Sequence, residues 1–167
     1  GSSTGVPRIG NVWGACDPSN PKNRRRRCAL LVERFGRGGC TTVLVDTPPD
    51  IRSQLLDVRI ERLDGVLFTH GHADHAHGID DLRGVFFLMK RRVAVYADAD
   101  TRDILFNRFE YCFRQKPGSL YPAILEARDI RPPDPVRIEG PGGPIEAVPI
   151  LQEHGSEMSL GFRFGDL

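Results

Sequence analysis

The feature that most constrains this 167-residue chain is a run of metal-binding side chains at residues 69–78, Thr-His-Gly-His-Ala-Asp-His-Ala-His-Gly. Four of the chain's five histidines lie in this run, and Asp74 lies among them. Imidazole and carboxylate groups are the ligands that hold zinc and other divalent first-row metals. The spacing is too dense for one structural tetrahedral site. It therefore predicts a turn that offers ligands to two neighbouring metals.

Histidines can also cluster in an expression tag or in an exposed low-complexity tract. A tag is usually an unbroken run at a terminus, whereas this run is internal. It follows residues 64–69, Asp-Gly-Val-Leu-Phe-Thr, which read as a buried strand. A metal site at the end of a strand is the favoured interpretation. His77 lies where a helix is expected to begin, so it is not counted among the ligands. It could instead support a ligand, contact the substrate or be an exposed side chain.

Length and composition bound the class of protein. A chain of 167 residues that is 40% hydrophobic predicts one domain with a sizeable core. The net charge of +1 gives no argument for nucleic acid or an anionic membrane. No apolar run approaches the roughly 18 residues that span a bilayer, and the polar beginning of the chain is unlike a signal peptide. None of the cysteines forms a Cys-x-x-Cys pair, so we expect reduced thiols and a cytoplasmic protein.

Strand-like and helix-like segments alternate along the chain. Helices are expected where apolar residues recur at helical spacing, at residues 51–58, 79–89 and 100–113. In the first of these, Ile51, Leu55, Leu56 and Val58 supply the apolar period. The expected strands are residues 28–33, 41–46, 65–69, 92–96, 145–151 and 159–164. The Gly-rich turn at 36–39 makes the first two a hairpin. The Pro-rich residues 114–144 are left unassigned. The alternation predicts an α/β (α+β) protein whose sheets are covered by helices.

The sequence His70-Gly-His72-Ala-Asp74-His75 after an apolar strand resembles the metal motif of the metallo-β-lactamase superfamily. The strand end Val-Leu-Val-Asp46 resembles the first acidic position of that family, and His154 after a later strand resembles its third metal motif. The opening Gly-Ser-Ser-Thr-Gly-Val-Pro and the four arginines before Cys28 narrow the resemblance. They are similar to the branch that holds the cyclic-phosphate phosphodiesterase of phosphonate breakdown and transfer-RNA 3′-processing nucleases.

The resemblance implies a four-layer αβ/βα sandwich with metals at one edge, on loops at strand ends. It implies that His70, His72 and His154 bind a first metal, and that Asp74 and His75 bind a second. The superfamily also uses a bridging Asp and a last His. No histidine follows His154, and Asp166 is the one later aspartate. We therefore expect residues 1–167 to form one domain that lacks its C-terminal part, with the remaining ligands beyond it. Asp166 stays open as a ligand.

A second expectation from the resemblance is a structural zinc, which this branch sometimes holds in its N-terminal loop, mainly with cysteines. Here Cys16 stands without a neighbouring cysteine, which argues against that zinc.

Two divalent ions, zinc or manganese, would lower the pKa of a shared water from about 15.7 toward about 7. The sequence thus predicts a metal-dependent hydrolase, foremost a phosphodiesterase that directs a metal-activated hydroxide at a small cyclic or nucleotide-like phosphate ester. Asp74 would bind the second metal and orient the nucleophile, so it is the predicted catalytic residue. Asp46 and Thr69 are expected behind the ligands, where Asp46 could accept a hydrogen bond from an imidazole or from Thr69.

Several alternatives stay open. A transfer-RNA processing ribonuclease would need a protruding basic arm that the sequence does not show, so nucleic acid is not the favoured substrate. A lactonase or thioesterase would use the same metals, and a metal-binding protein with an incomplete site would catalyse nothing. A homodimer is compatible with the sequence. Arginine forks match phosphate oxygens, so Arg24, Arg25, Arg26 and Arg27 are candidate substrate contacts, although most arginine runs are solvated faces.

The basic and aromatic residues of segment 107–122 raise a related question. Such residues can stack bases and hold phosphates, and the segment could form a lid. Packing of its aromatic rings on the core is the favoured interpretation.

Overall fold

The computed structural model describes residues 2–166, so Gly1 and Leu167, the ends of the expected domain, lie outside the described residues. The larger sheet has five strands in the order β1-β2-β3-β4-β5. Its first two strands form the predicted antiparallel hairpin, and β2 to β5 run parallel. The strands are β1 (Leu30–Gly36), β2 (Gly39–Val45), β3 (Gly65–Leu67), β4 (Val93–Ala97) and β5 (Leu125–Asp129).

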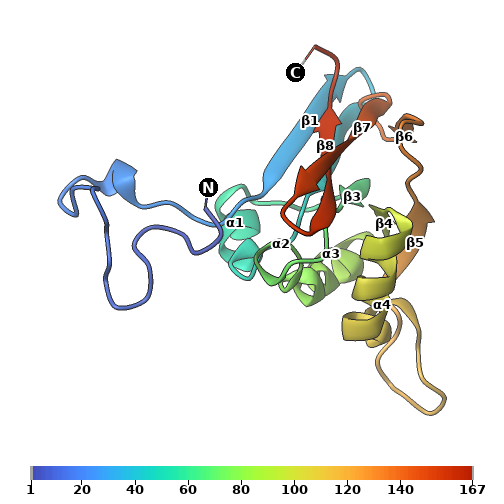
Figure 1. Ribbon diagram of the computed structural model, residues 1–167. Helices are drawn as coiled ribbons and strands as arrows, with labels where there is room; N and C mark the ends of the chain where they lie inside the picture. Colours follow the sequence, from blue (N-terminus) through green and yellow to red (C-terminus); the bar gives the residue numbers. More distant parts are fainter. Residues whose placement is uncertain (1, 167) are drawn as a thin grey trace.

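The smaller sheet is antiparallel, in the order β6-β7-β8, and consists of β6 (Val136–Ile138), β7 (Ile145–His154) and β8 (Glu157–Arg163). The helices are α1 (Ile51–Asp57), α2 (Ala73–Ala76), α3 (Leu82–Met89) and α4 (Ala99–Phe113), with 3-10 turns η1 (Pro21–Asn23) and η2 (Ile79–Asp81). Figure 1 shows α1, α2 and α3 in a row on one side of the larger sheet and the β7–β8 hairpin on the other.

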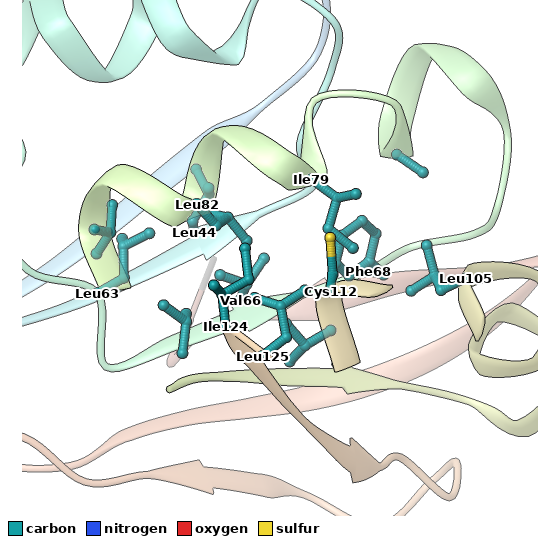
Figure 2. Packing of buried hydrophobic residues seen from close by; sticks show 14 of the residues in the cluster. Leu44, Leu63, Val66, Phe68, Ile79, Leu82, Leu105, Cys112, Ile124 and Leu125 are labelled. Atoms are coloured by element: carbon teal, nitrogen blue, oxygen red, sulfur yellow. The ribbon is translucent and has the colours of Figure 1, made fainter. Parts of the chain in front are cut away.

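Two apolar clusters occupy the two faces of the larger sheet, because successive side chains of a strand point to opposite faces. In β2, Leu44 packs toward the helices, whereas Val43 and Val45 pack toward the smaller sheet. Figure 2 shows the helix-side cluster, in which Ile79 and Leu82 meet the sheet. The described residues therefore form helix, sheet and sheet layers, which confirms the predicted α/β class.

The prediction for the apolar face of α1 was wrong in part. Ile51 and Leu55 are buried, but Leu56 and Val58 are 59% and 51% exposed. Residues four apart share a helix face, whereas Leu56 is rotated by about 100° from Leu55. The helix also ends at Asp57, before Val58. The prediction from apolar residues at helical spacing was therefore too wide: the buried stripe of α1 contains fewer of them.

Other differences concern boundaries and the unassigned segment. The expected helix at 79–89 is present but divides into η2 and α3. Strands β5 and β6 both lie in the Pro-rich segment 114–144 that the sequence left unassigned. Within segment 107–122, Phe113 is buried as favoured, but Tyr121 is 74% exposed, so aromatic packing on the core describes only part of it.

Gly78 tests how tightly the turn after α2 packs on the loop after β2. Its amide donates to Thr47 O, and a Cβ at Gly78 would lie 2.2 Å from Pro48 O. We expect Gly78→Ala to lower the free energy of unfolding by about 1–3 kcal/mol through overpacking. Gly84→Ala in α3 is the control, because nothing lies within 4 Å of its added Cβ. It should raise stability by about 0.5–1 kcal/mol. Urea unfolding measures both, and equal effects would contradict the packing argument.

Candidate metal centre

The metal-binding turn begins where two parallel strands end together. Val45 of β2 lies opposite Leu67 of β3, so the residues that follow each strand meet at the same edge of the sheet. Asp46 follows β2, and Thr69 and His70 follow β3. In open α/β sheets this carboxyl edge is where ligands bind. The parallel register therefore brings the acidic and histidine motifs together, although they are separate in the sequence.

Three imidazoles converge at this edge. The ring nitrogens of His70, His72 and His154 lie within 4.8 Å of one another, and His70 Nε2 is 3.0 Å from His72 Nδ1. His154 ends β7, and its ring centroid is 4.9 Å from that of His70. Zinc–nitrogen bonds of about 2.0–2.1 Å in a tetrahedron place ligand nitrogens about 3.3 Å apart. The donor set and its spacing therefore fit one divalent metal, as the sequence predicts.

Asp46 fixes the orientation of two histidine rings, that of His75 directly and that of His70 through Thr69. Its carboxylate accepts hydrogen bonds from Thr69 N (2.8 Å), from the Thr69 hydroxyl (2.8 Å) and from His75 Nδ1 (2.7 Å). The Thr69 oxygen in turn accepts from His70 Nδ1 (2.9 Å). Both histidines thus carry their proton on Nδ1, which leaves the Nε2 lone pairs available to a metal. Asp46 and Thr69 thus contact candidate ligands, and their supporting role stays a prediction.

The backbone of Asp46 is itself unusual. The residue is 3% exposed and has φ 63°, in the left-handed region that few residues other than glycine adopt. A strained residue of this kind persists only where its surroundings fix it, and such residues cluster at functional sites. Here the Asp46 amide donates to Leu67 O (2.8 Å) while its side chain holds Thr69 and His75. The conformation therefore directs the carboxylate at the ligand turn.

Glu157 orients the third ring and was not anticipated from the sequence. Its Oε2 lies 3.0 Å from His72 Nε2. Since a carboxylate accepts, His72 carries its proton on Nε2 and turns the lone pair of Nδ1 toward His70. The only signal for Glu157 is the β7–β8 register, which places it opposite His154. In this tautomer the lone pairs of His70 Nε2 and His72 Nδ1 face each other at 3.0 Å, an arrangement that a bound cation would stabilise.

The electrostatics agree with this assignment of protons. Burial, together with the neighbouring rings of His75 and His72, lowers the pKa of His70 to about 4 against the opposing charge of Asp46. His70 is therefore neutral at pH 7, as a metal ligand must be. The hydrogen bond to Asp46 raises the pKa of His75. A carboxylate behind an imidazole increases its basicity as a ligand.

Asp74 and His75 lie beside the three imidazoles. The His75 ring centroid is 4.3 Å from that of His70, and Asp74 Oδ2 is 3.5 Å from His75 Nε2. These two residues could supply one nitrogen and one carboxylate to a second metal. Among residues 2–166, the group of mutually close ligand atoms consists of His70, His72 and His154. It includes neither Asp166 nor a cysteine, so the role of Asp166 stays a prediction.

His77 lies away from the cluster. Its side chain is exposed, and its ring meets Phe109 edge-on, with centroids 5.5 Å apart. Its backbone amide donates to Ala73 O and ends α2. A substrate contact by His77 stays a prediction to which this position lends no support.

The four arginines diverge from one another. Arg24 lies over the Trp13 ring, Arg26 pairs with Asp57 at 2.5 Å, and Arg27 Nε donates to Ser3 O. The last three arginines, but not Arg24, line a cavity of about 490 Å³ whose other walls include the supports and one ligand of the candidate site: Asp46, Thr69 and His75. A substrate contact by Arg25, Arg26 or Arg27 is compatible with this cavity and stays a prediction.

With this geometry in place, the family is decided by sequence comparison. Residues 41–166 match the family described as the beta-lactamase superfamily domain. The chain belongs to the metallo-β-lactamase superfamily. The crystal structure of a new diphosphatase from the PhnP family is similar over 99% of this chain and 59% of that one, at 33% identity and a TM-score of 0.80. The predicted metallo-β-lactamase-like fold is therefore confirmed for the described residues.

Other relatives are more distant or cover less. An octanoyltransferase of Porphyromonas gingivalis is 34% identical over all of the chain but only 32% of that protein. Ribonuclease Z of a Bradyrhizobium strain is 33% identical over 53% of the chain and 30% of that enzyme. The chain thus spans about a third of the curated relatives it matches. The metallo-β-lactamase-fold protein YhfI of Bacillus subtilis, 18% identical with a TM-score of 0.53 over 83% of this chain and 57% of that one, shares the fold alone.

The helices give one further finding. The longest, α4, has 15 residues, and none in the described part of the chain is both long and apolar enough to cross a membrane.

Removing the charge of Asp46 should loosen the metal site. We expect Asp46→Asn to weaken zinc binding by about 10–100-fold, because His75 and Thr69 lose their shared acceptor. Competition with a coloured chelator measures the affinity. Asp57→Asn is the control, because Asp57 pairs with exposed Arg26 instead. Unchanged zinc affinity in Asp46→Asn would contradict the role assigned to this carboxylate.

Glu157→Gln offers a milder test of the same principle. A glutamine can present its Nε2 donors to His72 as readily as its oxygen, so the proton on His72 is no longer fixed. We expect zinc affinity to fall by about tenfold. Glu153→Gln is the matched control from the same hairpin, since Glu153 pairs across to Met158. The same chelator competition decides the outcome, and an equal loss in both variants would assign the effect to the hairpin.

Proposed function

We propose that this domain is a metal-dependent hydrolase, foremost a phosphodiesterase of small cyclic or nucleotide-like phosphate esters that uses two zinc or manganese ions. The observation that carries the proposal is the 3.0 Å approach of His70 Nε2 to His72 Nδ1, with His154 beside them. Three imidazoles and an adjacent Asp–His pair are the donor set of a hydrolytic metal centre. The resemblance to a PhnP-family diphosphatase at 33% identity supports a phosphate-ester substrate.

The residues of this chain divide the work. His70, His72 and His154 would hold one ion, and Asp74 with His75 would contribute to the second. Bound together, such ions lower the pKa of a water and neutralise charge that develops on phosphoryl oxygens. Asp74 would also accept a hydrogen bond from the attacking water and so orient it. The prediction of a bridging Asp and a last His beyond these residues stays a prediction.

Two other functions could use the same metals, and the first of them has support from a sequence match. The Ribonuclease Z match over 53% of the chain keeps an RNA phosphodiester as the second candidate substrate, and a metal-activated water would attack it in the same way. A lactonase or thioesterase would place a carbonyl carbon where phosphorus sits. Octanoyl transfer is not proposed for this chain, because the match covers only 32% of the octanoyltransferase.

The deciding experiment is hydrolysis of bis-p-nitrophenyl phosphate by protein loaded with zinc or manganese. We expect Asp74→Ala to lower kcat by about 100-fold or more, because the nucleophile loses the group that orients it. Asp134→Ala, in the exposed loop before β6, should match wild type. Metal analysis after purification without chelator gives the stoichiometry.

Each result separates the alternatives. Equal activity in wild type and Asp74→Ala would overturn the mechanism. Lactone hydrolysis without phosphodiester hydrolysis would favour the carbonyl substrate. Binding of a single metal without turnover would favour a metal-binding protein with an incomplete site, and absence of bound metal would overturn the whole proposal.

A further inference from the structure

Helix α4 lies directly against the turn that carries the histidines. Gly71 separates His70 from His72, and a Cβ at this position would lie only 2.6 Å from Cγ2 of Ile104 in α4. The Ile104 side chain of α4 therefore packs directly on the backbone of the turn at Gly71. A glycine is required here because of this close approach, and glycine is also the residue with the greatest backbone freedom. Something other than its own side chain must therefore fix the peptide between the two ligands.

Arg108 supplies that constraint. It follows Ile104 by four residues and so shares the same face of the helix. Its Nη1 donates to Gly71 O at 2.6 Å. A hydrogen bond from a charged donor is shorter and stronger than one between neutral groups. Ile104 and Arg108 thus hold Gly71 from the same helix, one by contact and one by a directed bond.

Helix α4 is kinked at Phe109, and this residue makes a second contact with the segment that carries the histidines. Phe109 has φ −131° and ψ 35°, outside the helical region, directly after Arg108. Its ring meets His77 edge-on at an interplanar angle of 83°. Helix α4 therefore contacts the metal-binding segment at both ends, at Gly71 before α2 and at His77 after it. Asp98 caps α4, and Leu105 and Cys112 are buried in the core, so these contacts come from an anchored element.

We propose that Arg108 is a positioning residue that sets the geometry of the metal centre by fixing the Gly71 carbonyl, and with it the relative orientation of His70 and His72. It acts through the backbone, since its guanidinium reaches the peptide oxygen and not a ligand ring. The proposal rests on the metal binding assumed in the proposed function, but it does not depend on which ester is hydrolysed.

The expected effect follows from the ligand geometry. His70 Nε2 and His72 Nδ1 must both approach one ion at about 2.0–2.1 Å. Rotation of the Gly71 peptide changes the angle between them while each ring keeps its own partner, Thr69 for His70 and Glu157 for His72. Loss of the Arg108 bond should therefore weaken binding by about 10–100-fold, as for other groups that orient ligands, and should distort the coordination of the metal that still binds.

The test compares Arg108→Met with Arg108→Lys. Methionine keeps much of the apolar stem but cannot donate, whereas lysine retains one donor that can reach a carbonyl. Arg102→Met is the matched control in the same helix, because Arg102 pairs with Asp103 and Asp129. Zinc affinity is measured by chelator competition. The visible absorption of the cobalt-loaded protein reports the coordination geometry, which a loss of global stability alone would not change in the folded fraction.

We expect Arg108→Met to lose about tenfold or more in zinc affinity and to shift the cobalt bands, with partial recovery in Arg108→Lys and wild-type behaviour in Arg102→Met. Unchanged affinity and spectrum in Arg108→Met, or an equal loss in Arg102→Met, would overturn the proposal. Wild-type protein that binds zinc but hydrolyses no ester would sink the proposed function alone, and the affinities would still decide the role of Arg108. Wild-type protein that binds no zinc would overturn both.

Discussion

The carboxylate of Asp46 is the group on which the candidate site depends. Its residue ends β2, its amide reaches back to Leu67 of β3, and its oxygens hold Thr69 and His75. The next residue, Thr47, donates from its amide to His75 O and accepts from Gly78 N. Hydrogen bonds therefore attach both the start and the finish of the ligand turn to the carboxyl edge of two parallel strands. Because the sheet is rigid, its register determines where the imidazoles lie. The left-handed backbone conformation of buried Asp46 costs some strain energy, which its several hydrogen bonds offset.

Two other elements complete the arrangement from opposite sides. The β7–β8 hairpin brings His154 as a ligand and Glu157 as the partner of His72. Helix α4 brings Arg108 to the peptide between His70 and His72. The imidazoles of the first site are thus held by two parts of the fold: His70 by the sheet through Thr69, and His72 and His154 by the hairpin, which brings Glu157 to His72 and carries His154 at the end of β7. The site forms only when the helical layer and both sheets are packed, which couples metal affinity to folding.

The residues that could be predicted from sequence are those whose signal is local. The density of histidines after an apolar strand indicated the turn, and Asp46 and Thr69 followed from their places at strand ends. His154 was predicted through the family resemblance, since a lone histidine after a strand carries no pattern of its own. Arg108 and Glu157 could not be found this way, because a contact between residues 37 apart, as for Arg108 and Gly71, leaves no periodicity in the chain. Leu56 shows the opposite case, in which a local signal led to a wrong prediction. Its place in the helical period indicated burial, but α1 is short and packs only one narrow face on the core, so Leu56 is exposed.

The two halves of the proposed centre differ in how completely the described residues supply them. The first site receives three imidazoles whose nitrogens already converge, and two of these rings are held by Thr69 and Glu157. The second receives one carboxylate and one imidazole among residues 2–166, with Asp46 behind the imidazole. Burial keeps His70 unprotonated at neutral pH, so this ligand can bind zinc without first losing a proton. Metal should therefore fill the His70–His72–His154 site first. Since we propose Asp74 for the second site, we expect an enzyme with only the first ion in place to bind metal without orienting the nucleophile.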